Sequence, residues 1–162
     1  MEMSSSRYAL AQLNIARLRA PLDSDELSGF VAALEPINAL ADSAPGFIWR
    51  LTGGDGADDA TSERFFGETN LLLNMSVWRD LAALNDFVFR GPHVEVMRQR
   101  RSWFFPMTEI YTALWWVSAG VMPTIADAEE RMLHLRAHGP TPHVFNFREP
   151  FPAPDEVATP PA

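Results

Sequence analysis

His93 is the side chain in this sequence best placed for acid–base or ligand chemistry. It follows the Gly91-Pro92 breaker, so it falls in the first turn of a helix predicted from Pro92 to about Phe105. The positive end of the helix dipole disfavours an imidazolium there, and a neutral imidazole can be a base, a hydrogen-bond partner or a ligand of metal or haem. We therefore predict His93 as the catalytic residue. The alternative is a histidine that only caps the helix or bonds a loop carbonyl.

The helix predicted after Pro92 brings further side chains to the same face. Helical spacing places Met97, Arg100 and Phe104 on the side of His93. A pocket beside this helix would then be lined by a basic residue among apolar ones. We predict these three as substrate-binding residues.

Arg98, Arg100 and Arg101 form a basic cluster in this helix, next to Trp103. A guanidinium beside a pocket could hold a carboxylate or phosphate through two hydrogen bonds. The alternative is pairing with surface carboxylates, because 21 Asp and Glu face 13 Lys and Arg in the chain. The many aromatic residues suit a flat apolar ligand, and they suit a core or a dimer interface equally well.

Two predicted strands carry the next candidates for the site, Asn14 and Trp78. In the strand over residues 8–15, Asn14 shares a face with Gln12. The strand over residues 70–78 alternates, and the face opposite its apolar residues carries Asn70, Asn74, Ser76 and Trp78.

In a split βαβ fold the first and third strands can be neighbours at the centre of the sheet. Asn14, Trp78 and His93 could therefore converge on one cavity between sheet and helices. The alternative is that Asn14 bonds at a strand edge or dimer interface and Trp78 is core. The full set of predicted substrate-binding residues is Asn14, Trp78, Met97, Arg100, Trp103 and Phe104. The sequence has no phosphate-binding glycine loop with a P-loop lysine, no HExxH and no nucleophile elbow.

The hydrophobic pattern predicts an α+β domain of the ferredoxin-like split βαβ kind, with an antiparallel sheet. Asp23 and Glu26 have capping-box spacing, and Pro36 should kink or split the helix behind them. The strand over residues 111–117 is apolar on both faces, which indicates a central position. Strands are predicted at 8–15, 47–52, 70–78, 111–117 and 144–147, and helices at 27–42, 81–88, 92–105 and between Thr124 and Gly139.

We expect one domain over residues 7–148 and a proline-rich tail, extended or disordered, over 149–162. Helices on only one face of the sheet would leave the other apolar face in water, which costs about 25 cal/mol per Å². A second copy of the chain is the simplest cover. The sequence therefore predicts a homodimer.

Composition narrows the function classes. The chain has no cysteine, so disulfides, thiolate metal sites and cysteine nucleophiles are excluded. Its formal net charge of −8 disfavours nucleic-acid binding. We find neither a secretory signal nor an apolar run of about 20 residues, which predicts a cytoplasmic protein without a membrane partner.

Longer stretches of the chain resemble an uncharacterised bacterial family. They are YALAQLNIARL, GFIWRL, SVWRDLAALNDFVFRGPHVEVMRQRRSWF, LWWVSAG and RAHGPTP. Over residues 7–153 the chain is similar to domain of unknown function 3291, of the dimeric α/β-barrel superfamily, alongside antibiotic-biosynthesis-monooxygenase-like proteins. The resemblance implies a dimeric α/β-barrel fold and a monooxygenase-like enzyme acting on an apolar or aromatic small molecule. The alternative is a non-catalytic dimer that binds a small apolar ligand or a protein partner.

The trio Asn14, Trp78 and His93 also resembles the asparagine, tryptophan and histidine of haem-degrading monooxygenases in the same superfamily. There the histidine ligates iron, so the resemblance implies haem as a candidate cofactor with His93 as its ligand. Here, however, an extra helix and turn separate Trp78 from His93. Without a flavin fingerprint or a clear metal triad, oxygen chemistry would need a bound haem or a substrate that activates oxygen itself.

Overall fold

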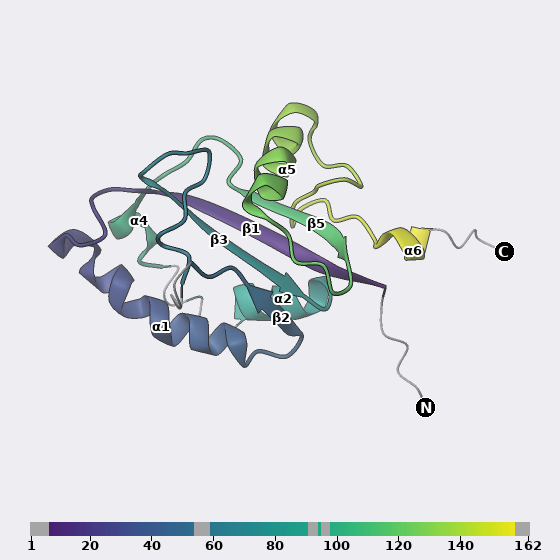
Figure 1. Cartoon of the computed structure of the whole chain (residues 1–162), viewed down its shortest axis with the longest axis horizontal. Helices are drawn as coiled ribbons and strands as arrows, with labels where there is room; N and C mark the ends of the chain where they lie inside the picture. Colours follow the sequence, from purple (N-terminus) through teal and green to yellow (C-terminus); the bar gives the residue numbers. More distant parts are fainter. Residues whose placement is uncertain (1–6, 54–58, 91–93, 95–97, 158–162) are drawn as a thin grey trace.

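The computed structural model describes residues 7–53, 59–90, 94 and 98–157, and it shows an antiparallel sheet with helices on both sides (Figure 1). None of the helices in these residues is long and apolar enough to cross a bilayer. The elements are β1 (Tyr8–Leu18), the 3-10 helix η1 (Asp25–Leu27), α1 (Ser28–Asp42), β2 (Phe47–Arg50), β3 (Leu71–Trp78), α2 (Leu81–Arg90), α4 (Arg100–Trp103), β4 (Phe104–Phe105), β5 (Thr112–Ser118), α5 (Ile125–His138) and α6 (Pro154–Val157).

β1 is the central strand of the sheet. It pairs with β3 on one side and with β5 and the short β4 on the other, while β2 pairs with the outer side of β3. The order β2-β3-β1-β5 with antiparallel pairing is that of the ferredoxin-like split βαβ fold. The predicted fold class and the predicted contact between the first and third strands are confirmed.

Side chains of β1 alternate between the two faces of the sheet. Leu10, Gln12, Asn14, Ala16 and Leu18 point to one side, where α1 and α2 lie (Figure 1). We call this side the α1 face. The opposite side, the α5 face, carries Ala9, Ala11, Leu13 and Ile15 and packs against α5.

The α5 face differs from the expectation that led to the homodimer prediction. We expected one apolar face of the sheet to carry no helix and to be covered by a second copy, but in the structure the same chain covers it. Met132 and Leu135 of α5 and Phe65 from the loop before β3 are fully buried against the strands. This helix begins near Thr124, as predicted, and the structure adds a capping box of Thr124 and Asp127 at its start. One chain therefore buries both faces of its sheet.

Of the helix predicted over residues 92–105, the structure describes as helical only Val94 and the four-residue α4 (Arg100–Trp103), with a turn at residues 98–99 before α4. Trp103 is its last residue, and Phe104 has extended backbone angles of φ −128° and ψ 145°. Phe104 and Phe105 pair with Leu18 and Arg17 of β1 as strand β4. Phe104 thus packs beside Leu18 as a strand residue. The prediction that Phe104 is a helical residue, placed by helical spacing on the side of His93, was wrong.

Two predicted features of α1 also differ. Asp23 and Glu26 form no capping box, because neither η1 nor α1 begins with a side-chain cap. Pro36 lies inside α1, which continues without interruption from Ser28 to Asp42. The residue before the helix, Leu27, is fully buried and anchors its start.

β5 lies at the edge of the sheet and not at its centre. On its outer side it meets Phe145, which exchanges two backbone hydrogen bonds of 2.8 Å with Leu114. Both faces of β5 are apolar because α5 covers Trp115 on one side, where the Arg131 guanidinium stacks 5.4 Å from its ring centre. On the other side the Trp116 indole donates to the carbonyl of Phe151.

The C-terminal segment, residues 144–153, packs against the domain. The strand predicted at 144–147 is only a bridge at Phe145, which is fully buried. Ala153 is also buried, Phe151 packs beside Phe145, and α6 follows. Residues 149–157, the described part of the predicted proline-rich tail, thus contact the domain through Phe151 and Ala153 and include the short helix α6.

Candidate functional site

Two adjoining hollows lie between the helices and the α1 face. The first, the Trp103 cavity, has a volume of about 150 Å³ and lies between α1 and the β1–β3 pair. The second, the Trp78 cavity, has a volume of about 320 Å³ and extends toward α2 and the C-terminal segment. Both are lined by Asn14, Ile37, Asn38, Asn74 and Arg100. These shared residues make them one continuous candidate site.

A row of polar side chains crosses the floor of the site. Strand register places Asn14 of β1 between Thr112 of β5 and Asn74 of β3. The Thr112 hydroxyl donates to Oδ1 of Asn14 over 3.2 Å. All three point to the α1 face because each strand alternates, so the row follows from pairing alone.

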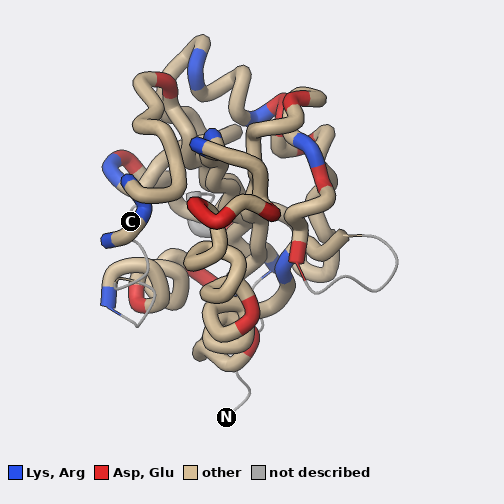
Figure 2. Tube along the Cα trace, turned by 90° about the vertical axis from the view of Figure 1, so that its left-hand side faces the viewer, with Lys and Arg blue, Asp and Glu red and all other residues tan. Residues whose placement is uncertain are grey.

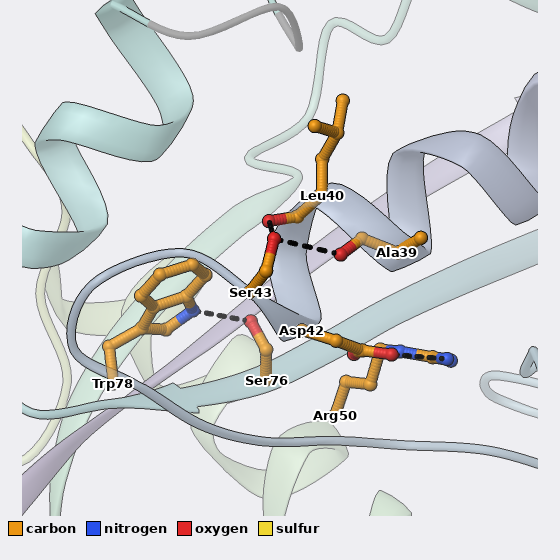
Figure 3. A network of polar contacts seen from close by, with 7 residues as sticks. All are labelled: Ala39, Leu40, Asp42, Ser43, Arg50, Ser76 and Trp78. Carbon is orange, nitrogen blue, oxygen red and sulfur yellow. Dashed lines mark hydrogen bonds and ion pairs between the residues drawn. The ribbon is translucent and has the colours of Figure 1, made fainter.

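A second polar row lies one pair further along the strands. Gln12 faces Ser76, and both are only 7% exposed. Gln12 Nε2 donates to Ser76 Oγ over 2.9 Å and to Asn74 Oδ1 over 2.7 Å. The Trp78 indole N–H donates to the same Ser76 Oγ over 2.8 Å (Figure 3). The two rows are therefore joined through Asn74.

Aromatic side chains form the walls of the Trp78 cavity. Phe87 of α2 stacks on Trp78 with ring centres 5.2 Å apart, and Phe47 of β2 meets Trp78 edge-on at 5.4 Å. Phe147 from the C-terminal segment lies against Phe89 at the end of α2, with ring centres 5.2 Å apart. These rings pack on one another, and Trp78, only 1% exposed, is core as the alternative interpretation held, so the cavity wall is aromatic and apolar.

Arg100 brings a positive charge to both cavities. Its guanidinium lies 4.9 Å from the ring centre of Tyr111 and 5.7 Å from that of Phe104. Among the residues described it has no carboxylate within ion-pair distance, whereas other arginines do. Acidic and basic residues are interspersed along the trace in Figure 2. Ion pairs of arginines in the described part of the chain include Arg17–Glu68, Arg50–Asp42, Arg79–Asp80, Arg90–Asp86 and Arg136–Glu109.

The rim near β2 is fixed by an ion pair. Arg50 lines the Trp78 cavity, and its Nε lies 2.8 Å from a carboxylate oxygen of Asp42, the last residue of α1 (Figure 3). Ser43 then bonds the carbonyls of Ala39 and Leu40 and closes the helix end. Arg50 thus holds the end of α1, whereas Arg100 lines both cavities without a carboxylate partner among the residues that the structure describes.

Comparison with known proteins assigns the family. Residues 9–160, nearly the whole chain, match the family described as "Domain of unknown function (DUF3291)". The chain belongs to the DUF3291 family. Among curated proteins, no match to the chain is found.

Several solved structures are similar to this DUF3291 domain at low identity. PA3566 from Pseudomonas aeruginosa is 13% identical with a TM-score of 0.48, over 74% of this chain and 100% of that one. SnoaB from Streptomyces nogalater, a cofactor-independent oxygenase, is 13% identical with a TM-score of 0.46, over 70% of this chain and 95% of that one. The monooxygenase ActVA-Orf6 of Streptomyces coelicolor, solved with nanaomycin D, is 12% identical with a TM-score of 0.41, over 73% of this chain and 95% of that one. These figures concern the fold and say nothing of what this DUF3291 domain acts on.

Most of the predicted site residues of this DUF3291 domain meet at the two cavities. Asn14 and Arg100 line both, Trp78 lines the larger, and Trp103 and Phe104 line the smaller. The candidate catalytic residue His93 and the candidate Met97 lie outside the described residues. Their roles stay predictions.

Sequence reasoning missed several lining residues. Gln12, Asn74 and Ser76 share strand faces with predicted site residues, so the alternation could have identified them. Phe147 could not be found this way, since it was predicted only as the last residue of a short strand and no pattern indicated its contact with α2. Helical spacing puts Asn38 on the apolar face of α1 but did not mark it as a site residue: it is a buried amide with no side-chain partner in the described part of the chain.

The described residues give haem little support. Neither cavity is lined by a described histidine or methionine, so the usual nitrogen and sulfur ligands are missing from the lining that is described. His134, His138 and His143 cluster on and beyond α5, and no group of described side chains there or elsewhere could hold a metal ion. A haem site would depend on His93.

Proposed function

We propose that the joined Trp103 and Trp78 cavities bind a flat, apolar or aromatic small molecule, on which the protein acts as a monooxygenase-like enzyme. The observation that carries the proposal is one hollow with aromatic walls, a polar floor and an arginine that no described carboxylate neutralises. Ligand pockets have this character: mostly apolar surface with a few polar groups that fix orientation. The reaction class comes from the sequence resemblance to antibiotic-biosynthesis-monooxygenase-like proteins.

The residues would divide the work as follows. Trp78 and Phe87 would hold the rings of the substrate, and Asn14 and Asn74 would orient its oxygen atoms. The Arg100 guanidinium would stabilise negative charge as the substrate ionises. His93, from the sequence, is the proposed base. Cofactor-independent oxygenation of an activated methylene balances as R₂CH₂ + O₂ → R₂C=O + H₂O, so the substrate supplies the electrons.

The second candidate function is binding without catalysis. The same cavities would serve a carrier or sensor of a small apolar ligand, since no described carboxylate or imidazole lines them beside a hydroxyl. The two candidates differ in one measurable quantity, which is consumption of oxygen in the presence of a bound substrate.

Anthrone is a suitable probe because its central methylene is activated by a carbonyl. We expect the protein to bind anthrone, consume one O₂ per anthrone oxidised and release the quinone. The variant Arg100→Met should lower turnover about tenfold or more, since a preorganised charge at the reacting oxygen is worth several kcal/mol. Arg101→Met is the matched control, because Arg101 is exposed and lines neither cavity. Binding without oxygen uptake would favour the binding protein, and no binding of any aromatic molecule would reject both.

The homodimer remains a proposal, with a different surface from the one the sequence indicated. The α5 face is buried within the chain, so a dimer would have to form elsewhere. Exposed apolar side chains that could contribute are Val31 and Leu40 of α1 and Ile48 of the edge strand β2. Sedimentation equilibrium at micromolar concentration tests it, and a mass of one 18.1 kDa chain would reject it.

A further inference from the structure

We propose that Gln12 sets the hydrogen-bond polarity of the Trp78 cavity, so that the site holds its ligand through an acceptor oxygen. This inference rests on the small-molecule site proposed above and adds the chemistry of the group that is bound. Suitable groups are a ketone or quinone carbonyl, a phenolate or a carboxylate. Gln12 acts through its neighbours and is a positioning residue.

Ser76 shows the polarity most clearly. An indole N–H can only donate, so the 2.8 Å contact with Trp78 makes Ser76 Oγ an acceptor. Gln12 Nε2 donates to the same oxygen over 2.9 Å. Both lone pairs of the hydroxyl are then occupied, and its own proton must be donated elsewhere. No described residue accepts it, and Ser76 lines the cavity, so the proton is available to a ligand.

The orientation of the Gln12 amide follows from the cost of the alternative. With Nε2 toward β3, its two hydrogens are used by Ser76 and Asn74. The reversed amide would leave two N–H groups of a buried side chain without acceptors, because no other described residue bonds the far end of Gln12. Unpaired buried N–H groups are rarer than under-satisfied carbonyl oxygens. The donating orientation is therefore favoured.

The two asparagines of the floor are turned the same way. Oδ1 of Asn74 accepts from Gln12, and Oδ1 of Asn14 accepts from the Thr112 hydroxyl. The Nδ2 groups of both residues have no acceptor in the described part of the chain, and both residues line the Trp78 cavity. Together with Ser76 and Arg100, the floor offers donors to the ligand. An acceptor oxygen is the matching group, and an ionised one gains most because charge-assisted hydrogen bonds are stronger.

Gln12→Glu tests the proposal by reversing the direction of the hydrogen bonds that Gln12 makes with Ser76 and Asn74. An ionised carboxylate only accepts, so it would take the Ser76 proton and an Nδ2 hydrogen of Asn74 and turn Oδ1 of Asn74 to the cavity. The probes are 2-acetylnaphthalene and 2-isopropenylnaphthalene, two neutral molecules of the same shape that differ by C=O against C=CH₂. Isothermal titration calorimetry should show the wild type binding the ketone more tightly. In Gln12→Glu the ratio of the two affinities should shift toward the alkene by about tenfold, which is one hydrogen bond's worth of free energy.

If Gln12 had only a structural role, Gln12→Glu would weaken the binding of both probes equally and leave the ratio of their affinities unchanged. If Gln12→Glu does not fold, Ser76→Ala is the variant to test. It should lower the affinity for the ketone about tenfold and leave the affinity for the alkene unchanged. Ser76→Thr, which keeps the hydroxyl, should restore the affinity for the ketone. An alkene bound more tightly by the wild type, or a ratio unchanged in both variants, would overturn the inference while leaving the small-molecule site in place. Failure of the wild type to bind either probe or any other aromatic molecule would instead reject the proposed site, and the inference with it.

Discussion

Phe147 of the C-terminal segment packs edge-to-face on Phe89 of α2, with ring centres 5.2 Å apart and an interplanar angle of 80°. Both line the Trp78 cavity, although Phe89 is 58% exposed. The segment holds Phe147 in place because Phe145 is bonded to Leu114 and Trp116 bonds the carbonyl of Phe151. The pair therefore closes one side of the cavity with a ring held by the C-terminal segment and a ring from the last turn of α2.

Phe147→Ala should weaken the binding of an aromatic ligand. An aromatic pair contributes about 0.5–1.5 kcal/mol beyond its buried area, so we expect the dissociation constant to rise about threefold to tenfold. Tryptophan fluorescence quenching by 2-acetylnaphthalene measures it. Phe105→Ala is the matched control, since Phe105 is also partly exposed but lines neither cavity. Equal affinities for Phe147→Ala and the wild type would show that the C-terminal segment takes no part in the site.

Gly46 fixes the approach of β2 to α2, and its replacement should be costly. Its φ is +84°, and a Cβ built there would stand 2.4 Å from the Cβ of Ala83. Its carbonyl also accepts from the amide of Arg79 over 2.7 Å, at the end of β3. Gly46→Ala should lose about 2–5 kcal/mol of unfolding free energy, from the left-handed backbone and from overpacking.

Urea unfolding followed by fluorescence measures this loss. Gly120 offers the control, because its φ of +86° is similar but a Cβ would meet nothing within 4 Å. Gly120→Ala should therefore lose only the backbone part, about 1–2 kcal/mol. Equal losses in the two variants would mean that the contact with Ala83 does not constrain α2.

The alternation of side chains explains why much of the site could be predicted from sequence. Asn74, Ser76 and Trp78 were assigned to one face of their strand, and the predicted neighbour strand placed Asn14 opposite them. Pairing then fixes the polar floor without further information, because a strand can present a residue to only two sides. Arg100 and Trp103 lie beside this floor on the four-residue helix α4, which is only part of the helix predicted over residues 92–105.

What sequence could not give is which surface each remaining element covers. The periodicity of α5 shows an apolar stripe, but the same stripe could pack on either face of the sheet or on another chain. Strand β5 carries Trp115 and Trp116 on opposite sides, a pattern that a central strand and a covered edge strand share. The short strand β4 forms because Phe104 pairs with Leu18, which is far away in the sequence, so no local sequence pattern predicts it.

The burial of the α5 face within one chain can be tested with two neighbouring residues of α5. Met132 is fully buried against the sheet, whereas Leu133 is 56% exposed. Met132→Asp would place a carboxylate in an apolar core without a partner, so we expect it to lose about 3 kcal/mol or more of unfolding free energy. Leu133→Asp should change it by no more than about 0.5 kcal/mol, as surface substitutions do. If a second copy covered the sheet and α5 lay elsewhere, the two variants would unfold at the same urea concentration.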